Sequence, residues 1–139
     1  MKKLKIVLLL VIVFILNIIW EFSHYQFYID LTGIPPTTHL IIASLTDVFL
    51  IGLIFMLISL INKSPKWIDK PGLKDYTFII IFSLIISTII ELYSVSRGRW
   101  AYTSAMPTIF GIGLSPLIQL FTTGIVSLSL LKLINRTNI

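Results

Sequence analysis

The sequence contains no cysteine and few charged residues. The absence of cysteine from 139 residues excludes disulfides, thiolate metal sites and a cysteine nucleophile. Charged residues make up only 12%, about half the share of a typical soluble domain. Hydrophobic residues make up 56% and the mean hydropathy is +0.97. Because a small soluble domain buries only about two-thirds of its surface, this composition excludes a soluble enzyme, a nucleic-acid-binding module and a disordered chain.

Four apolar runs are long enough to cross a bilayer, which takes about 20 mostly apolar residues. They predict transmembrane helices over residues 5–28, 38–62, 75–96 and 106–134. No strand-like alternation competes with these runs. The sequence therefore predicts an all-α, integral membrane four-helix bundle, with residues 1–139 forming a single transmembrane domain. Pro116, with Gly111 and Gly113 just before it, predicts a kink in the last helix.

Basic residues gather at the ends of the apolar runs. The chain has 11 Lys and Arg against 6 Asp and Glu, with three lysines near the N-terminus and four in the 63–75 loop. The 29–37 loop has no Lys or Arg. By the positive-inside rule, both termini are expected to be cytoplasmic in a multi-pass protein of a prokaryotic plasma membrane. Trp67, between lysines, is expected to rest on lipid head groups.

Polar residues recur at helical spacing inside each apolar run. In the first run, Asn17, Glu21, His24 and Tyr28 share one helix face. We expect the four polar stripes to turn inward, where Ser, Thr and Gly would serve ordinary helix packing. The other three stripes consist of His39, Ala43, Thr46 and Asp47, then Ser83, Ser87, Glu91 and Ser94, then Thr108, Gly111, Ser115, Gln119 and Thr122.

Three carboxylates lie within the predicted spans. A charge at membrane depth costs about 2.5–3.5 kcal/mol, so Glu21, Asp47 and Glu91 must be paired, protonated or solvated in a cavity. At 1.5 Å per residue, Glu21 and Glu91 each lie about 24 Å from the inner helix ends, and Asp47 lies about 15 Å from the outer end. This predicts a polar pocket that faces outward or into the outer leaflet. The alternative is structural ion pairing of the glutamates with Arg97 or Arg99.

The residue types in this pocket suit acid–base chemistry. Two carboxylates in a dry site can act as acid and base, which assigns catalytic roles to Glu21, Glu91 and Asp47. Arginines at the mouth could hold a phosphate or carboxylate head group. The predicted substrate-binding residues are His24, Arg97, Arg99, Gln119 and Tyr28. An interfacial position is the competing interpretation of His24 and His39. An outer aromatic belt is the expected role of Trp20, Tyr25, Trp100 and Tyr102, and it is also the competing interpretation of Tyr28.

A metal site is not predicted. The sequence Glu21-x-x-His24 matches the repeated unit of carboxylate-bridged metal bundles, but the third run offers Glu91-x-x-Ser94 in place of a second unit. The sequence identifies no cofactor. The expected partners are membrane lipids and a lipid-like small molecule, without nucleic acid. A homo-oligomer is left open.

Two segments carry a family resemblance, NIIWEFSHYQFY (17–28) and GRWAYTSAMPTIFGIGLSPLIQL (98–120). Their pattern resembles that of small uncharacterised prokaryotic four-helix membrane proteins, and it implies no known activity. The spacing from Glu91 to Arg97, followed by a glycine-containing helix, is similar to that in VanZ-like membrane proteins. Neither resemblance assigns a role to a residue.

Three functions remain open from the sequence. The leading hypothesis is a pocket that binds or processes a lipid or isoprenoid-type substrate. The alternatives are a non-enzymatic structural or assembly subunit of a membrane complex, and a small oligomeric transporter. Whether the protein is an enzyme stays open at this point.

Overall fold

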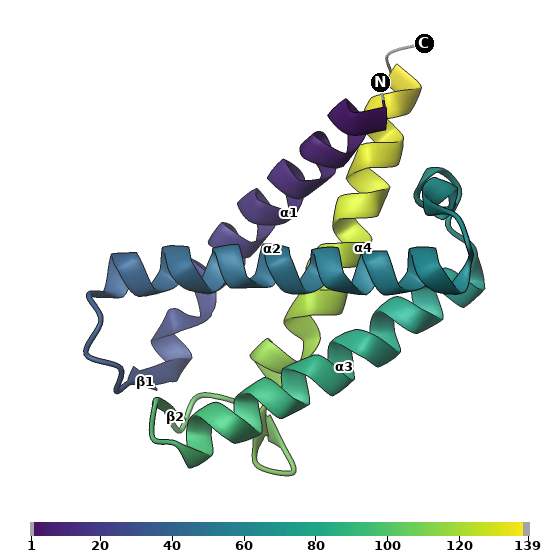
Figure 1. Ribbon diagram of the computed structural model, residues 1–139. Helices are drawn as coiled ribbons and strands as arrows, with labels where there is room; N and C mark the ends of the chain where they lie inside the picture. The colour runs from purple at the N-terminus through teal and green to yellow at the C-terminus, as the bar shows by residue number, and fades with distance from the viewer. Residues whose placement is uncertain (1, 138–139) are drawn as a thin grey trace.

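Four long helices make up most of the computed structural model, which describes residues 2–137 (Figure 1). Each is long and apolar enough to cross a membrane. The protein is therefore a small multi-pass membrane protein, and the predicted all-α four-helix bundle is confirmed. In chain order, the elements are α1 (Lys2–His24), η1 (Tyr25–Phe27), β1 (Tyr28–Asp30), α2 (Pro36–Ile61), η2 (Pro65–Asp69), α3 (Leu73–Ser96), β2 (Trp100–Tyr102), β3 (Thr108–Ile109), β4 (Ile112–Gly113) and α4 (Leu114–Thr137).

The start of the last helix differs from the prediction. Residues 108–113 form the hairpin β3–β4 instead of helix, with Ile109 paired to Ile112. The two residues of its turn, Phe110 and Gly111, have φ of 52° and 79°, the left-handed values that a tight hairpin turn requires and a helix forbids. The predicted kink at Pro116 is also wrong. Pro116 lies in the first turn of α4, where a backbone N–H has no helical partner to lose.

The strands β1 and β2 join the end of α1 to the end of α3. They pair antiparallel, with Tyr28 opposite Tyr102 and Asp30 opposite Trp100. Since side chains alternate along a strand, these four residues share one face of the ribbon. Ile29, on the other face, is 48% exposed. The ribbon thus presents three aromatic rings and one carboxylate to the same side.

The core is aliphatic and lies where the helices cross. The helix α1 contacts α2 and α4, α4 contacts α3, and α2 packs less closely against α3. Many large apolar side chains on the outer helix faces are exposed, as lipid contact requires. The most deeply buried aliphatic residues are Leu9, Val13, Ile51, Ile54, Ile58, Ile79, Leu120, Leu128 and Leu131.

The start of α1 and the end of α4 lie at one end of the bundle, and the ribbon β1–β2 lies at the other (Figure 1). Lys5 Nζ contacts Asp69 Oδ1 at 3.2 Å, which places the α2–α3 connection at the end of the termini. Trp67 in that connection is buried, stacks edge-on against Phe55 and donates to Ser59 Oγ at 2.8 Å. The expectation that Trp67 rests on lipid head groups is therefore wrong. The cytoplasmic location of the termini stays a prediction.

Candidate functional site

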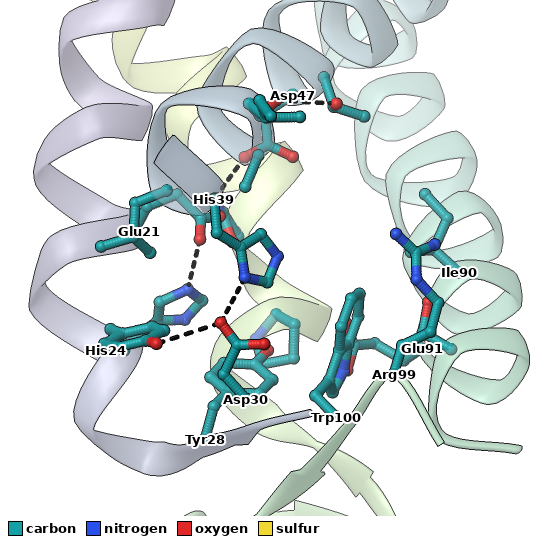
Figure 2. A pocket seen from close by; sticks show the side chains of 18 of the residues that line it. Glu21, His24, Tyr28, Asp30, His39, Asp47, Ile90, Glu91, Arg99 and Trp100 are labelled. Carbon is teal, nitrogen blue, oxygen red and sulfur yellow. Dashed lines mark hydrogen bonds and ion pairs between the residues drawn. The ribbon is translucent and has the colours of Figure 1, made fainter. Parts of the chain in front are cut away.

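A cavity of about 210 Å³ lies near the β1–β2 end of the bundle. All four helices and both strands of the ribbon contribute to its wall. Figure 2 shows Glu21, His24 and Asp30 on one side, and Glu91, Arg99 and Trp100 on the other. Pockets for whole drug-sized ligands measure about 300–1,000 Å³, so this cavity suits a small molecule or the head of a larger one.

Most of the predicted site residues meet in this cavity. Seven of the eight line it, namely Glu21, His24, Tyr28, Asp47, Glu91, Arg99 and Gln119. Arg97 does not line it. Its guanidinium lies over the ring of Tyr93, 5.5 Å from the centroid, on the exposed C-cap of α3. The prediction that Arg97 belongs to the site is therefore wrong, because the chain turns at Gly98 and directs only Arg99 toward the cavity.

Gln119 is the centre of a buried hydrogen-bond network. Its Nε2 lies 2.7 Å from Glu21 Oε1, 2.7 Å from Asp47 Oδ2 and 3.1 Å from Asn17 Oδ1, so its two hydrogens are shared among three acceptors. Gln119 is 4% exposed and Asn17 is fully buried. The carboxyl groups of Glu21 and Asp47 thus accept from the same nitrogen. One amide from α4 thus holds polar groups of α1 and α2 together.

His24 is held in one orientation by residues of α1 and α4. The Trp20 indole N–H donates to Ser115 Oγ at 3.2 Å, and the same Oγ lies 2.7 Å from His24 Nδ1. The serine hydrogen is then free to bond to Nδ1, which leaves the ring hydrogen on Nε2. Nε2 faces Glu21 Oε2 at 3.2 Å. His24 therefore acts as a hydrogen-bond donor to Glu21 and is not an interfacial residue.

Glu91 is anchored by the ribbon and not by an arginine. Its Oε2 accepts hydrogen bonds from Tyr102 Oη at 2.5 Å and from Trp100 Nε1 at 3.2 Å. Burial, followed by the bond to Glu91, raises the pKa of the Tyr102 hydroxyl, so Tyr102 stays protonated as a donor. Within residues 2–137, the acidic partners in ion pairs are Asp69, Glu21 and Asp30, and no arginine takes part. The alternative of glutamate–arginine ion pairing is therefore not supported.

Asp30 caps the turn between β1 and α2 and orients His39. Its Oδ2 accepts from His39 Nδ1 at 2.6 Å and from Tyr25 Oη at 3.1 Å. Its Oδ1 accepts from the backbone N–H and hydroxyl of Thr32. Burial alone would raise the pKa of this carboxyl, but the hydrogen bonds from Thr32 and His39 outweigh burial and hold the pKa below its ordinary value.

The variant Asp30→Asn is expected to lower the free energy of unfolding at pH 7 by about 1–2 kcal/mol, since it weakens charge-assisted hydrogen bonds. Because the Asp30 carboxyl has a lower pKa in the folded state than in the unfolded state, its ionised form stabilises the fold at pH values above the unfolded pKa of about 3.9. This stabilisation is lost as the pH falls toward the lower, folded-state pKa. Thermal unfolding in detergent at pH 7 and pH 3 checks this. An equal gap between wild type and variant at both pH values would contradict it.

Sequence reasoning missed the partners of Glu91. Trp100 and Tyr102 were interpreted as part of a lipid-facing aromatic belt, yet their polar atoms bond to Glu91. Their spacing of two residues is the strand period, and this signal was available in the segment 100–102. The inward stripe of the third run is confirmed, since Ser83, Ser87, Glu91 and Ser94 are buried.

Within residues 2–137, no group of three or more His, Asp or Glu side chains is arranged to hold a metal ion. No family model, curated protein or solved structure matches this chain. The resemblance to small four-helix and VanZ-like membrane proteins stays a prediction. The chemistry of the cavity is thus the basis for any assignment of function.

Proposed function

We propose that this protein binds or processes a lipid or isoprenoid-type molecule in the plasma membrane of a prokaryote, with both termini in the cytoplasm. The observation that carries the proposal is the convergence of Glu21, Asp47 and Glu91 on one cavity inside four apolar helices. Carboxylates at membrane depth are costly and usually functional. A cavity in that position is reached most directly by a molecule already dissolved in the bilayer.

The cavity wall has the two-sided chemistry that an amphiphile needs. Apolar side chains such as Leu40, Leu50 and Ile90 line it together with the carboxylates. Its volume of about 210 Å³ cannot enclose a whole two-chain lipid. We therefore expect the polar end of the substrate to enter the cavity and its chain to lie along the helices.

Glu21 and Asp47 supply the means for proton transfer. Two carboxyl groups that accept from the same amide nitrogen in a buried site share one proton more readily than they hold two charges. The protonated member can donate to the substrate while the ionised member accepts a proton from it, so the site returns to its starting state. His24 and Gln119 fix the Glu21 carboxylate for this exchange.

Native mass spectrometry of the protein in mild detergent tests this function. Wild type is expected to retain a bound lipid-like molecule, and the double variant Glu21→Gln/Glu91→Gln is expected to lose it while keeping its helical content. The matched control is Asp69→Asn, which removes a carboxylate at the opposite end of the bundle. The proposal fails if wild type carries no such molecule, or if the folded double variant retains as much as wild type.

A second candidate function, as a structural subunit of a membrane complex, is favoured by one contact. Asn17 of α1 bonds to both Gln119 and Thr123 of α4, which is typical of polar residues that hold helices together. This alternative predicts that the double variant loses stability or assembly and that wild type carries no ligand. The same experiment therefore separates the two functions.

A further inference from the structure

The cavity wall holds more hydrogen-bond acceptors than donors. Gln119 Nε2 carries two hydrogens but faces three acceptor oxygens, of which those of Glu21 and Asp47 belong to residues that line the cavity, while the third, from Asn17, lies behind it. On the opposite side, both donors near Glu91, Trp100 Nε1 and Tyr102 Oη, bond to the same oxygen, Oε2. Within residues 2–137, no hydrogen bond reaches Glu91 Oε1. A ligand that completes this wall must bring hydrogen-bond donors.

Ser87 gives an independent sign of a missing partner. It lines the cavity, is 4% exposed, and its Oγ has no hydrogen-bond partner within residues 2–137. Ser44 and Ser59 of α2 bond back to the carbonyl four residues earlier, whereas Ser83 and Ser87 of α3 do not, and of these two only Ser87 lines the cavity within residues 2–137. Ser87 lies one turn from Glu91 on α3, so both unpartnered oxygens belong to the same wall of the cavity.

The charge and the aromatic rings of the site favour a cationic donor. Within residues 2–137, Asp47 forms no ion pair with a basic side chain. Among the described residues that line the cavity, Arg99 is the single lysine or arginine. The rings of Tyr28 and Trp100 pack edge to face with centroids 6.1 Å apart, and both line the cavity, so its wall offers aromatic surface, which attracts cations. Burial and the nearby glutamates raise the pKa of Tyr28, so its ring stays neutral.

Arg99 complements this wall with a positive charge at the mouth. Arg99 lines the cavity but is exposed, and its guanidinium lies 5.5 Å from the ring centroid of Trp100. A guanidinium binds phosphate oxygens bidentately. The site therefore pairs an anion-binding group at its mouth with acceptor oxygens inside.

We propose that the cavity binds the head group of an amphiphile that carries a primary ammonium next to a phosphate, as phosphatidylethanolamine does. This inference rests on the function proposed above and names the substrate class. The N–H donors of the ammonium bond to Glu91 Oε1 and Ser87 Oγ, and the ammonium faces the single negative charge that Glu21 and Asp47 carry between them. The phosphate lies against Arg99, and the acyl chains remain in the bilayer.

Competitive native mass spectrometry tests the inference. Wild type is incubated in detergent with equal amounts of phosphatidylethanolamine, phosphatidylcholine and phosphatidylglycerol with identical acyl chains, and a polyprenol. We expect phosphatidylethanolamine to be retained about tenfold or more over phosphatidylcholine, because N-methylation removes every N–H donor. Phosphatidylglycerol, which lacks the amine, is expected to bind as weakly as phosphatidylcholine.

Three variants place this preference in the cavity. Glu91→Gln is expected to bring the retention of phosphatidylethanolamine close to that of phosphatidylcholine. Ser87→Ala removes one hydroxyl without burying a new polar group, so it folds, and it is expected to lower the preference about 2–10-fold. The control Asp69→Asn is expected to keep the wild-type preference.

Each other outcome overturns the inference. Equal retention of phosphatidylethanolamine and phosphatidylcholine, or an unchanged preference in Ser87→Ala, contradicts an ammonium bound at this wall. Selective retention of the polyprenol or of phosphatidylglycerol, lost in Glu21→Gln/Glu91→Gln, would overturn the ammonium assignment while supporting the proposed function. A wild type that retains no lipid would overturn both.

Discussion

Replacement of Gln119 by leucine is expected to lower the free energy of unfolding by about 2–4 kcal/mol. The change removes the donor that Glu21, Asp47 and Asn17 share, at a position that is 4% exposed. Acceptors left without a donor in a buried site lose the full benefit of solvation. Reversible unfolding in mixed detergent micelles, followed by circular dichroism, measures the loss.

Two comparison variants show whether this loss comes from the network. Ser129→Leu makes the same kind of change at an exposed position of α4, and we expect it to leave stability nearly unchanged. In Gln119→Leu/Asp47→Leu the donor and one acceptor are both absent, so part of the lost stability should return. A Gln119→Leu protein as stable as wild type would show that the network contributes little.

Replacement of Gly113 by alanine is expected to cost about 1–3 kcal/mol and to weaken ligand retention as well. A Cβ at this position would lie 2.9 Å from Tyr102 Cε1 and 3.2 Å from both Met106 Sδ and Pro116 Cδ. The ring of Tyr102 must then move, and its hydroxyl holds Glu91. Unfolding in mixed micelles and native mass spectrometry measure the two effects.

The matched control is Gly52→Ala in α2. Nothing lies within 4 Å of a Cβ at Gly52, and alanine is favoured over glycine in a helix by about 1 kcal/mol. We expect this variant to be as stable as wild type or more stable, with unchanged ligand retention. If both glycine variants behaved alike, the contact between Gly113 and Tyr102 would have no role in the site.

Hydropathy was sufficient to predict the helices but not where the last one begins. An apolar run of the length of 106–134 satisfies the membrane criterion, and two glycines and a proline within it do not by themselves end a helix. The deciding feature is the left-handed backbone at Phe110 and Gly111, and hydropathy carries no information about φ. The burial of Trp67 was missed for a related reason. It depends on the packing of η2 against Phe55 of α2, and hydropathy does not predict such a contact.

The site was predictable where one helix face determines it. The spacing of Asn17, Glu21 and His24 predicts a shared inward face, and all three take part in the buried network. The role of the segment after α3 depends on its pairing with β1, a contact between residues some 70 apart in the sequence. This explains why Arg97 was included and the anchors of Glu91 were missed.

The position of Gln119 in the fourth helix has a consequence for the order in which the chain enters the membrane. Glu21 and Asp47 belong to the first two helices, whereas the amide that binds both arrives only with α4. During synthesis from the N-terminus, both carboxyl groups reach the bilayer before this donor exists. The earlier helices must therefore wait with these groups protonated or at the lipid–water boundary, and the insertion of α4 completes the assembly.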